Sequence, residues 1–173
     1  DKRLHQAREL LRGHVINDIL HRPGWSEISA VWEQQGVICK GRMDRVADDW
    51  SLIIDIKKCQ VGAATLEEIE ASIANYGWHR QASMYVDAIT YYTGVTPLFA
   101  WLFVEDGPPY DVNFLPCDDE TLQIGRMETN EVLLAWKAAV QAGKYPGYLA
   151  DTKNVLRGGV SEWYRKRFNS KVL

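Results

Sequence analysis

The sequence predicts an α/β fold in which helices flank a mixed central β-sheet. Three observations support this prediction. Segments with helical spacing of apolar residues alternate along the chain with strand-like segments. Three consecutive strand-like segments are joined by short turns, which is typical of an antiparallel meander. The segment 97–104 is continuously apolar, as expected of a strand that is covered on both faces. The predicted order is helix, three strands, helix pair, two strands and helix.

The composition indicates an ordinary globular protein. The chain has 173 residues, of which 46% are hydrophobic and 25% are charged. This length is sufficient for one domain with a full core, so we expect residues 1–173 to form a single domain. The chain opens on a helix-like pattern, and we also expect it to be the C-terminal part of a longer protein.

Charge and cysteine content exclude several classes of function. The net charge of -3 argues against a uniformly basic nucleic-acid coat, so a contact with DNA requires a local basic patch or a metal. The three cysteines are unclustered, which argues against a zinc finger or an iron–sulfur cluster. Free thiols suit a reducing cytosol, no apolar run is long enough for a membrane span, and no signal peptide is visible. These features favour a cytoplasmic protein.

The first half of the chain predicts one helix and the meander. Residues 3–20 have the spacing of an amphipathic helix, which the segment His21-Arg-Pro-Gly24 ends. Apolar and polar residues then alternate in three strands, separated by turns at Gln35-Gly36 and Asp48-Asp49. The three predicted strands cover residues 27–34, 37–46 and 51–57.

The second half predicts two helices, two strands and a long helix. Thr65-Leu-Glu-Glu68 matches a capping box, and the helix it opens is interrupted at Gly77. A second helix covers about 78–93, and a second strand, 110–115, follows the apolar strand. Asp118 caps a helix that extends to about residue 142. The apolar side chains available to pack this helix are Leu122, Ile124, Met127, Val132, Leu133, Trp136 and Val140.

Three charged side chains lie on the second and third predicted strands. Asp44 is on the second strand, and Asp55 and Lys57 are on the third. Because side chains alternate along a strand, Asp55 and Lys57 share one face. The opposite face carries the apolar anchors Leu52, Ile54 and Ile56. Charged groups at an apolar sheet are costly unless a metal or a substrate uses them.

These residues suit the chemistry of phosphodiester cleavage. Neighbouring carboxylates repel unless a cation lies between them, and hard oxygen ligands select magnesium or manganese. Such a metal polarises a phosphodiester and lowers the pKa of a bound water, and Lys57 can stabilise charge on the phosphate. The carbonyl of Ile56 offers a further oxygen ligand. The alternative is a solvated strand edge, but the apolar neighbours of Asp55 and the following helix with Gln81 and Tyr85 favour a site.

The motifs resemble the PD-(D/E)xK nuclease superfamily in its RecB-like branch. They are Gly41-Arg-Met-Asp44, Ile53-Ile-Asp-Ile-Lys57 and Gln81-x-x-x-Tyr85. The segments 26–32, 39–44 and 76–81 more closely resemble phage-type exonucleases of the RecE (exonuclease VIII) kind, within a similarity that covers about residues 10 to 143. The resemblance implies a restriction-endonuclease-like core in the order α-βββ-α-ββ-α, and cleavage of DNA with Mg²⁺.

The resemblance also implies roles for individual residues. Asp44 and Asp55 bind the metal, Lys57 is the catalytic lysine, and Gln81 and Tyr85 support the site and contact DNA. Glu27 lies where the superfamily often has an acidic residue. It is a metal ligand, a residue just outside the ligands, or a surface acid at a strand end.

One residue expected in RecE-like enzymes, a metal-binding His, is not found at its usual place in this sequence. These enzymes commonly carry a metal-binding His in a Gly-x-x-x-His helix well before the strands. His5 and His14 lie too close to Asp44, and only Gly13-His14 resembles that context. The resemblance then places the metal-binding His before residue 1, which would leave this chain with an incomplete metal shell.

Basic residues around the predicted site can contact phosphates or can be plain surface charges. The candidates for binding nucleic acid are Arg42, Lys58 and Arg80, with Lys40 and Arg45 nearby.

The leading hypothesis is a Mg²⁺-dependent DNA exonuclease of a phage or prophage recombination system, with Mn²⁺ as a substitute. The RecE resemblance implies 5′ to 3′ digestion of double-stranded ends, a homo-oligomer, a single-strand annealing protein as partner, and a bacterial or phage-infected cell. The alternatives are an endonuclease with the same metal core and a non-catalytic DNA-binding or assembly module that keeps the fold.

Overall fold

The computed structural model describes residues 9, 12–145, 147, 159–162 and 165–166. The chain divides into two compact units, Asp1–Ala138 and Ala139–Leu173. The first unit contains the sheet and all the predicted site residues. No described helix has the length and apolar character needed to cross a membrane.

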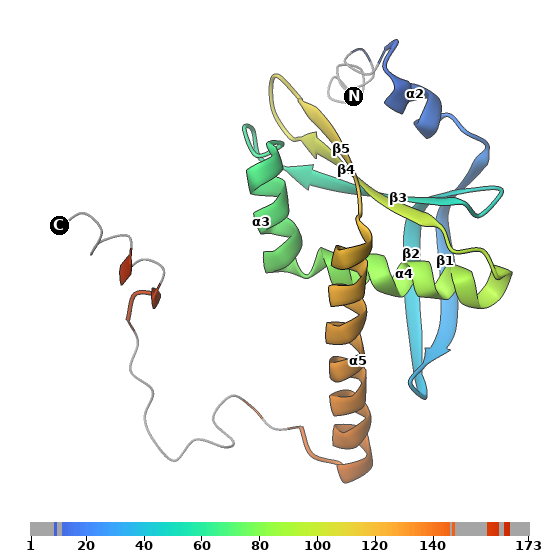
Figure 1. Cartoon of the computed structure of the whole chain (residues 1–173), viewed down its shortest axis with the longest axis vertical. Coiled ribbons are helices and arrows are strands. Elements are labelled where there is room, and N and C mark those ends of the chain that lie inside the picture. Colours follow the sequence, from blue (N-terminus) through green and yellow to red (C-terminus); the bar gives the residue numbers. More distant parts are fainter. Residues whose placement is uncertain (1–8, 10–11, 146, 148–158, 163–164, 167–173) are drawn as a thin grey trace. The chain divides into compact units, whose positions relative to one another are not determined.

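A five-stranded sheet in the order β1-β2-β3-β4-β5 is the centre of the first unit (Figure 1). The strands β1 to β3 are antiparallel, β3 and β4 are parallel, and β4 and β5 are antiparallel. The predicted mixed sheet and its meander are therefore confirmed. The strands are β1 (Gly24–Gln34), β2 (Val37–Ala47), β3 (Leu52–Cys59), β4 (Leu98–Glu105) and β5 (Val112–Pro116).

The predicted helix pair and the last helix are present, and both begin with the predicted caps. The Oγ1 of Thr65 accepts a hydrogen bond from the backbone N–H of Glu68 at 3.4 Å, and Oδ1 of Asp118 accepts one from Thr121 at 2.7 Å. Such caps satisfy donors that a helix start leaves free. The helices are α2 (Val15–Leu20), α3 (Leu66–Tyr76), α4 (Trp78–Thr93) and α5 (Asp119–Ala142).

The prediction of one helix over 3–20 is wrong for its described part, because α2 begins only at Val15. Gly13 has a φ of 76°, which breaks the helical path. His14 caps the new start, with its Nδ1 accepting from the N–H of Ile16 at 3.2 Å. Residues 1–8, 10 and 11 of the predicted helix lie outside the described residues.

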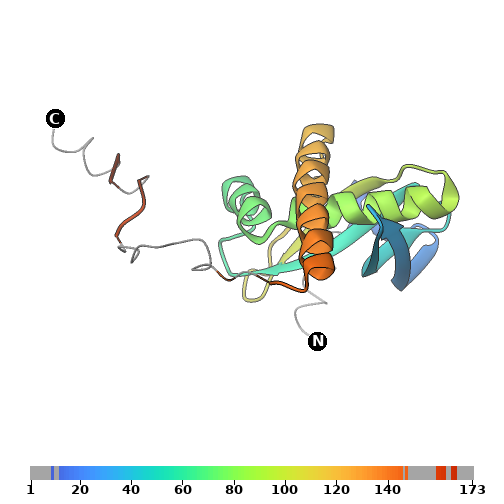
Figure 2. The same cartoon turned by 90° about the horizontal axis from the view of Figure 1, so that it is seen from below.

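The two faces of the sheet are covered by different helices. On one face, Phe99, Trp101 and Phe103 of β4 pack in a core with side chains of α3, α4 and α5. Figure 2 shows α3 and α4 on the same side of the sheet. On the other face, Ala100 and Leu102 pack with α2. The continuously apolar sequence of β4 is thus explained, as predicted, by burial on both sides.

Only part of the predicted apolar anchor of β3 is buried. Leu52 and Ile54 are buried against α2, whereas Ile56 is 51% exposed. The expectation that Ile56 anchors the sheet is therefore wrong. The core of this face includes Ile16, Ile19 and Leu20 of the six-residue α2 but not Ile56.

Helix α5 packs through a narrow stripe. A Cβ on Gly125 would lie 2.3 Å from the backbone oxygen of His79, so α4 and α5 cross closely. Leu122, Thr129 and Leu133 complete the buried stripe. The other apolar side chains expected to pack are 45–66% exposed, which corrects that expectation: Ile124, Met127, Val132, Trp136 and Val140.

Candidate active site

Strands β2 and β3 diverge at the level of Asp44 and Asp55. Their register contains the pairs Arg45↔Ile54 and Val46↔Ile53, and its continuation places Asp44 opposite Asp55. Just beyond the last pair, the backbone N–H of Ile56 donates to Oδ2 of Asp44 at 2.7 Å. The structure therefore brings together the two acids that the sequence placed on neighbouring strands, where the backbone ladder ends.

Strand β1 is also irregular at this level. Glu27 has a left-handed φ of 57° and is absent from the register between Ser26↔Arg45 and Ile28↔Met43, opposite Asp44. A left-handed φ at a residue other than glycine costs about 1–3 kcal/mol and persists where the surroundings impose it, often at functional sites. The Glu27 side chain is 58% exposed and forms an ion pair with Nε of Arg42 at 2.9 Å.

Asp55 is a buried acid with incomplete compensation. Its residue is 2% exposed. Oδ2 of Asp55 lies 2.6 Å from Nζ of Lys57, but it accepts no well-aligned hydrogen bond from any described residue. Burial raises the pKa of Asp55 above its ordinary value, Lys57 opposes the rise, and Asp44 adds to it. Because the pKa stays raised despite Lys57, a further cation beside this carboxylate would stabilise its charged form.

Lys57 is held by three groups on β3 and α4. Besides contacting Asp55, its Nζ donates to Oε1 of Gln81 at 2.8 Å and lies 5.0 Å from the ring centroid of Trp78. An ammonium over an indole face is attracted to it by the ring quadrupole. The role of Trp78 was not predicted, because only its place before Gln81 was visible in the sequence.

Gln81 and Tyr85 connect this lysine to β2, as their spacing of one helical turn allows. Nε2 of Gln81 donates to the hydroxyl of Tyr85 at 3.3 Å, and this hydroxyl donates to the carbonyl of Arg42 at 3.0 Å. Figure 1 shows α4 crossing β1 and β2, which brings Tyr85 to β2. Side-chain contacts thus link Asp55, Lys57, Gln81 and Tyr85 in one network. Asp44 joins it through the backbone N–H of Ile56.

Gly41 makes room for Tyr85. A Cβ on Gly41 would lie 2.5 Å from Cε1 of the buried Tyr85 ring, which is too close for any real contact. We expect Gly41→Ala to lower the free energy of unfolding by about 1–3 kcal/mol, because Tyr85 must shift and lose its hydrogen bonds. Chemical denaturation measures this change.

The matched control for this glycine is Gly147→Ala, where a Cβ would meet no atom of a described residue within 4 Å. In a Tyr85→Leu background the cost of Gly41→Ala should shrink, since the ring that causes the clash is gone. An equal cost in both backgrounds would show that the contact with Tyr85 is not the cause.

Each of the predicted DNA-binding residues has a carboxylate partner. Arg42 pairs with Glu27, Lys58 with Asp106 at 3.4 Å, and Arg80 with Glu128 at 3.7 Å. Their side chains are 43–67% exposed, and exposed ion pairs contribute only about 0–1 kcal/mol. Phosphates can therefore replace the carboxylates at low cost. Their contact with DNA stays a prediction.

The other two nearby basic residues differ. Lys40 is exposed, whereas Arg45 donates from Nη1 to the carbonyl of Gly24 at 3.1 Å. Arg45 therefore ties β2 to the start of β1.

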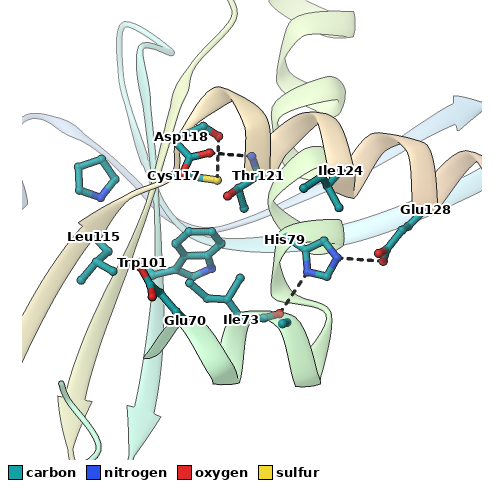
Figure 3. Close-up of a pocket in the computed structure, with 12 residues that line it drawn as sticks. Glu70, Ile73, His79, Trp101, Leu115, Cys117, Asp118, Thr121, Ile124 and Glu128 are labelled. Atoms are coloured by element: carbon teal, nitrogen blue, oxygen red, sulfur yellow. Dashed lines mark hydrogen bonds and ion pairs between the residues drawn. The ribbon is translucent and has the colours of Figure 1, made fainter. Parts of the chain in front are cut away.

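A separate pocket lies between α3, α4 and α5 (Figure 3). His79 lies in its wall, with Nε2 2.9 Å from Oε2 of Glu128 and Nδ1 3.2 Å from the carbonyl of Ile73. Burial raises the pKa of the Cys117 thiol to about 12, so this cysteine is unsuited to be a nucleophile. None of the predicted site residues lines this pocket.

The residues at Asp44 and Asp55 fit a hard divalent cation. No group of three or more His, Cys, Asp or Glu side chains in the described part of the chain is arranged to hold a metal. Mg²⁺, however, usually takes only one or two carboxylates and keeps several waters. Two neighbouring acids, one of them buried with a pKa that stays raised despite its ion pair with Lys57, meet that requirement. The carbonyl of Ile56 and the side chain of Glu27 stay predicted ligands.

The fold resembles that of a solved structure of another protein. A proposed exonuclease from Eubacterium rectale matches with a TM-score of 0.66 and 15% identity, over 92% of this chain and 63% of that protein. This chain thus spans less than two thirds of that protein. An alkaline exonuclease from Laribacter hongkongensis matches with a TM-score of 0.46 and 16% identity, over 95% of this chain and 73% of its own length. No curated protein sequence matches the chain.

A family model assigns the chain to a protein family. The model describes a PDDEXK-like domain of unknown function (DUF3799), and it matches residues 3–157. The match includes every residue of the network around Asp55 and confirms the superfamily predicted from the motifs. The chain therefore belongs to the DUF3799 family of PDDEXK-like domains.

Proposed function

We propose that this protein is a metal-dependent deoxyribonuclease that removes nucleotides from the ends of double-stranded DNA. The observation that carries the proposal is the environment of Asp55. This buried carboxylate is ion-paired with Lys57 and feels the charge of Asp44, and its pKa stays raised despite the lysine. On a PDDEXK-like domain, this arrangement matches the chemistry of phosphodiester hydrolysis.

Asp44, Asp55 and the carbonyl of Ile56 would hold Mg²⁺, or Mn²⁺ in its place, with Glu27 as a further acid. When bound, the metal would polarise the phosphodiester and lower the pKa of the attacking water. The two acids supply negative charge that offsets the cation, and Asp44 also holds the N–H of Ile56. This hydrogen bond fixes β3 at the residue between Asp55 and Lys57.

Lys57 supplies the positive charge for the phosphate. Charge that develops on the phosphate is stabilised by a donor that is already in position. Gln81 and Trp78 fix the ammonium of Lys57, and Tyr85 orients Gln81. Arg42, Lys58 and Arg80 would contact the DNA backbone around the site.

The finer parts of the proposal rest on the resemblance to RecE-type enzymes. We propose 5′ to 3′ digestion, a role in phage or prophage recombination with a single-strand annealing protein, and a homo-oligomer in the bacterial cytoplasm. The proposal treats residues 1–173 as one nuclease domain.

Digestion of an end-labelled linear duplex and a covalently closed circle, each with and without Mg²⁺, tests the proposal. We expect loss of the linear duplex with Mg²⁺ only, and an intact circle. Cleavage of the circle would instead show an endonuclease with the same metal core. No cleavage, together with no heat on calorimetric titration of Mg²⁺ or Mn²⁺, would overturn the proposal in favour of a non-catalytic module.

A further inference from the structure

A pocket of about 400 Å³ opens beside the catalytic network, separate from the pocket of Figure 3. The end of β3 contributes Lys58, α3 contributes Glu68 and Tyr76, and the start of α4 contributes Trp78. We call it the aromatic pocket. The Trp78 ring that lines it also contacts the ammonium of Lys57, so the pocket and the proposed site have this side chain in common.

Three aromatic rings run from the core to the aromatic pocket. Phe103 is 1% exposed, and its ring centroid lies 5.6 Å from that of Trp78. Trp78 in turn stacks with Tyr76 at 5.0 Å and an angle of 27°. Tyr76 is nevertheless 71% exposed. Its ring is therefore supported by the half-buried Trp78 and the buried Phe103, while much of its surface is open to a ligand.

The polar groups of the aromatic pocket indicate which part of a nucleotide suits it. Glu68 and Asp106 contribute two carboxylates, whereas Lys58 contributes one ammonium, which pairs with Asp106 at 3.4 Å. Unless the DNA backbone displaces Asp106 from Lys58, this balance disfavours a phosphate in the pocket. Carboxylates instead accept hydrogen bonds from amino groups on base edges. A flat heteroaromatic ring with N–H donors fits both the acids and the Tyr76 platform.

We propose that the aromatic pocket holds an unpaired nucleobase at the end of the DNA, stacked on Tyr76. The inference rests on the proposed nuclease function, and it adds a substrate preference for frayed or single-stranded ends. Removing a base from the duplex costs energy, and the cost is lowest for a base that is already unpaired. A stacked terminal base would also define where the next phosphodiester lies relative to Lys57.

Fluorescence of 2-aminopurine tests this inference without cleavage. The base is placed in a short single-stranded overhang of a duplex, at the 5′ end in one substrate and the 3′ end in another. All proteins carry Asp55→Asn, which blocks hydrolysis under the proposed function. Anisotropy of a separate label reports DNA binding, and 2-aminopurine fluorescence reports stacking, because stacking quenches it.

We expect quenching with at least one overhang, and its retention in Tyr76→Phe, which keeps the ring. Tyr76→Ala should lose the quenching and bind the overhang about 5- to 150-fold more weakly, the range for one base–aromatic stack. The matched control is Tyr91→Ala, since Tyr91 is an exposed tyrosine of α4 that does not line the aromatic pocket. It should leave both signals unchanged.

Two failures are distinguishable. DNA binding that is unchanged by Tyr76→Ala, or quenching that persists in it, overturns the nucleobase site and leaves the nuclease proposal standing. No anisotropy change with any DNA for the protein that carries Asp55→Asn alone, together with no digestion by the unmodified chain, overturns both proposals.

Discussion

The substitution Asp55→Asn should abolish cleavage and, at the same time, stabilise the metal-free protein at neutral pH. Loss of a carboxylate ligand removes several kcal/mol of transition-state stabilisation, so we expect the rate to fall about a thousand-fold or more. The gain in stability is expected because the Asp55 carboxylate, although useful for cleavage, destabilises the folded chain. The raised pKa of Asp55 means that its charged form is less favourable in the folded chain than in the unfolded one.

The pH dependence of this effect has a defined sign. In the unfolded chain Asp55 titrates near its ordinary value of 3.8, and in the folded chain it titrates above that value. Between these two values the folded state binds more protons, so stability falls as the pH rises through this window. Asn carries no charge and avoids this loss. Above the pKa that Asp55 has in the unfolded chain, the variant should therefore be more stable than the natural chain, and it should keep this gain at neutral pH.

Thermal unfolding from acid to neutral pH, with and without Mg²⁺, measures both effects. Mg²⁺ should raise the melting temperature of the natural chain but not of Asp55→Asn, because ligands stabilise only the state that binds them. Asp48→Asn, at an exposed acid of the β2–β3 turn, is the matched control and should change neither activity nor metal response. Full activity in Asp55→Asn would exclude Asp55 from the catalytic site.

The part of the site that could be predicted depends on short-range periodicity. Alternation along one strand placed Asp55 and Lys57 together, and one helical turn placed Gln81 beside Tyr85. A short turn between β2 and β3 then restricted the register enough to bring Asp44 near Asp55. These relations span few residues, so the sequence pattern alone specifies them.

The features of the site that could not be predicted depend on how α4 packs against the strands. The ring of Trp78 beneath Lys57 and the space that Gly41 leaves for Tyr85 arise from this packing. The left-handed Glu27 is a property of the β1 backbone that no local motif indicated. Likewise, the exposure of Ile56 follows from packing on the α2 face, because alternation specifies the face but not what covers it.

Replacing Lys57 with Met should reduce cleavage about 100- to 1000-fold, the usual cost of losing one positioned charge-stabilising donor. Met has a similar length and can keep contact with the Trp78 ring, so the change mainly removes the ammonium. Lys57→Arg should not restore full activity, because a planar guanidinium cannot reproduce the contacts of one ammonium with Asp55 and Gln81.

The same substitution should alter metal binding in a way that a general loss of structure would not. Lys57 lowers the pKa of Asp55, so its removal should raise that pKa further. Because a metal must displace the proton of a carboxylic acid, Mg²⁺ binding to Lys57→Met should require a higher pH than binding to the natural chain. Calorimetric titration at several pH values measures this shift, and single-turnover digestion measures the rate.

Lys144→Met, at an exposed lysine beyond α5, is the control for loss of a surface ammonium. It should leave the rate and the pH dependence of metal binding unchanged. If Lys57→Met cleaved DNA within about tenfold of the natural rate, the loss would be smaller than one positioned donor contributes. Lys57 would then be only the counter-ion of a buried acid, and the charge that faces the phosphate would have to come from the arginines around the site.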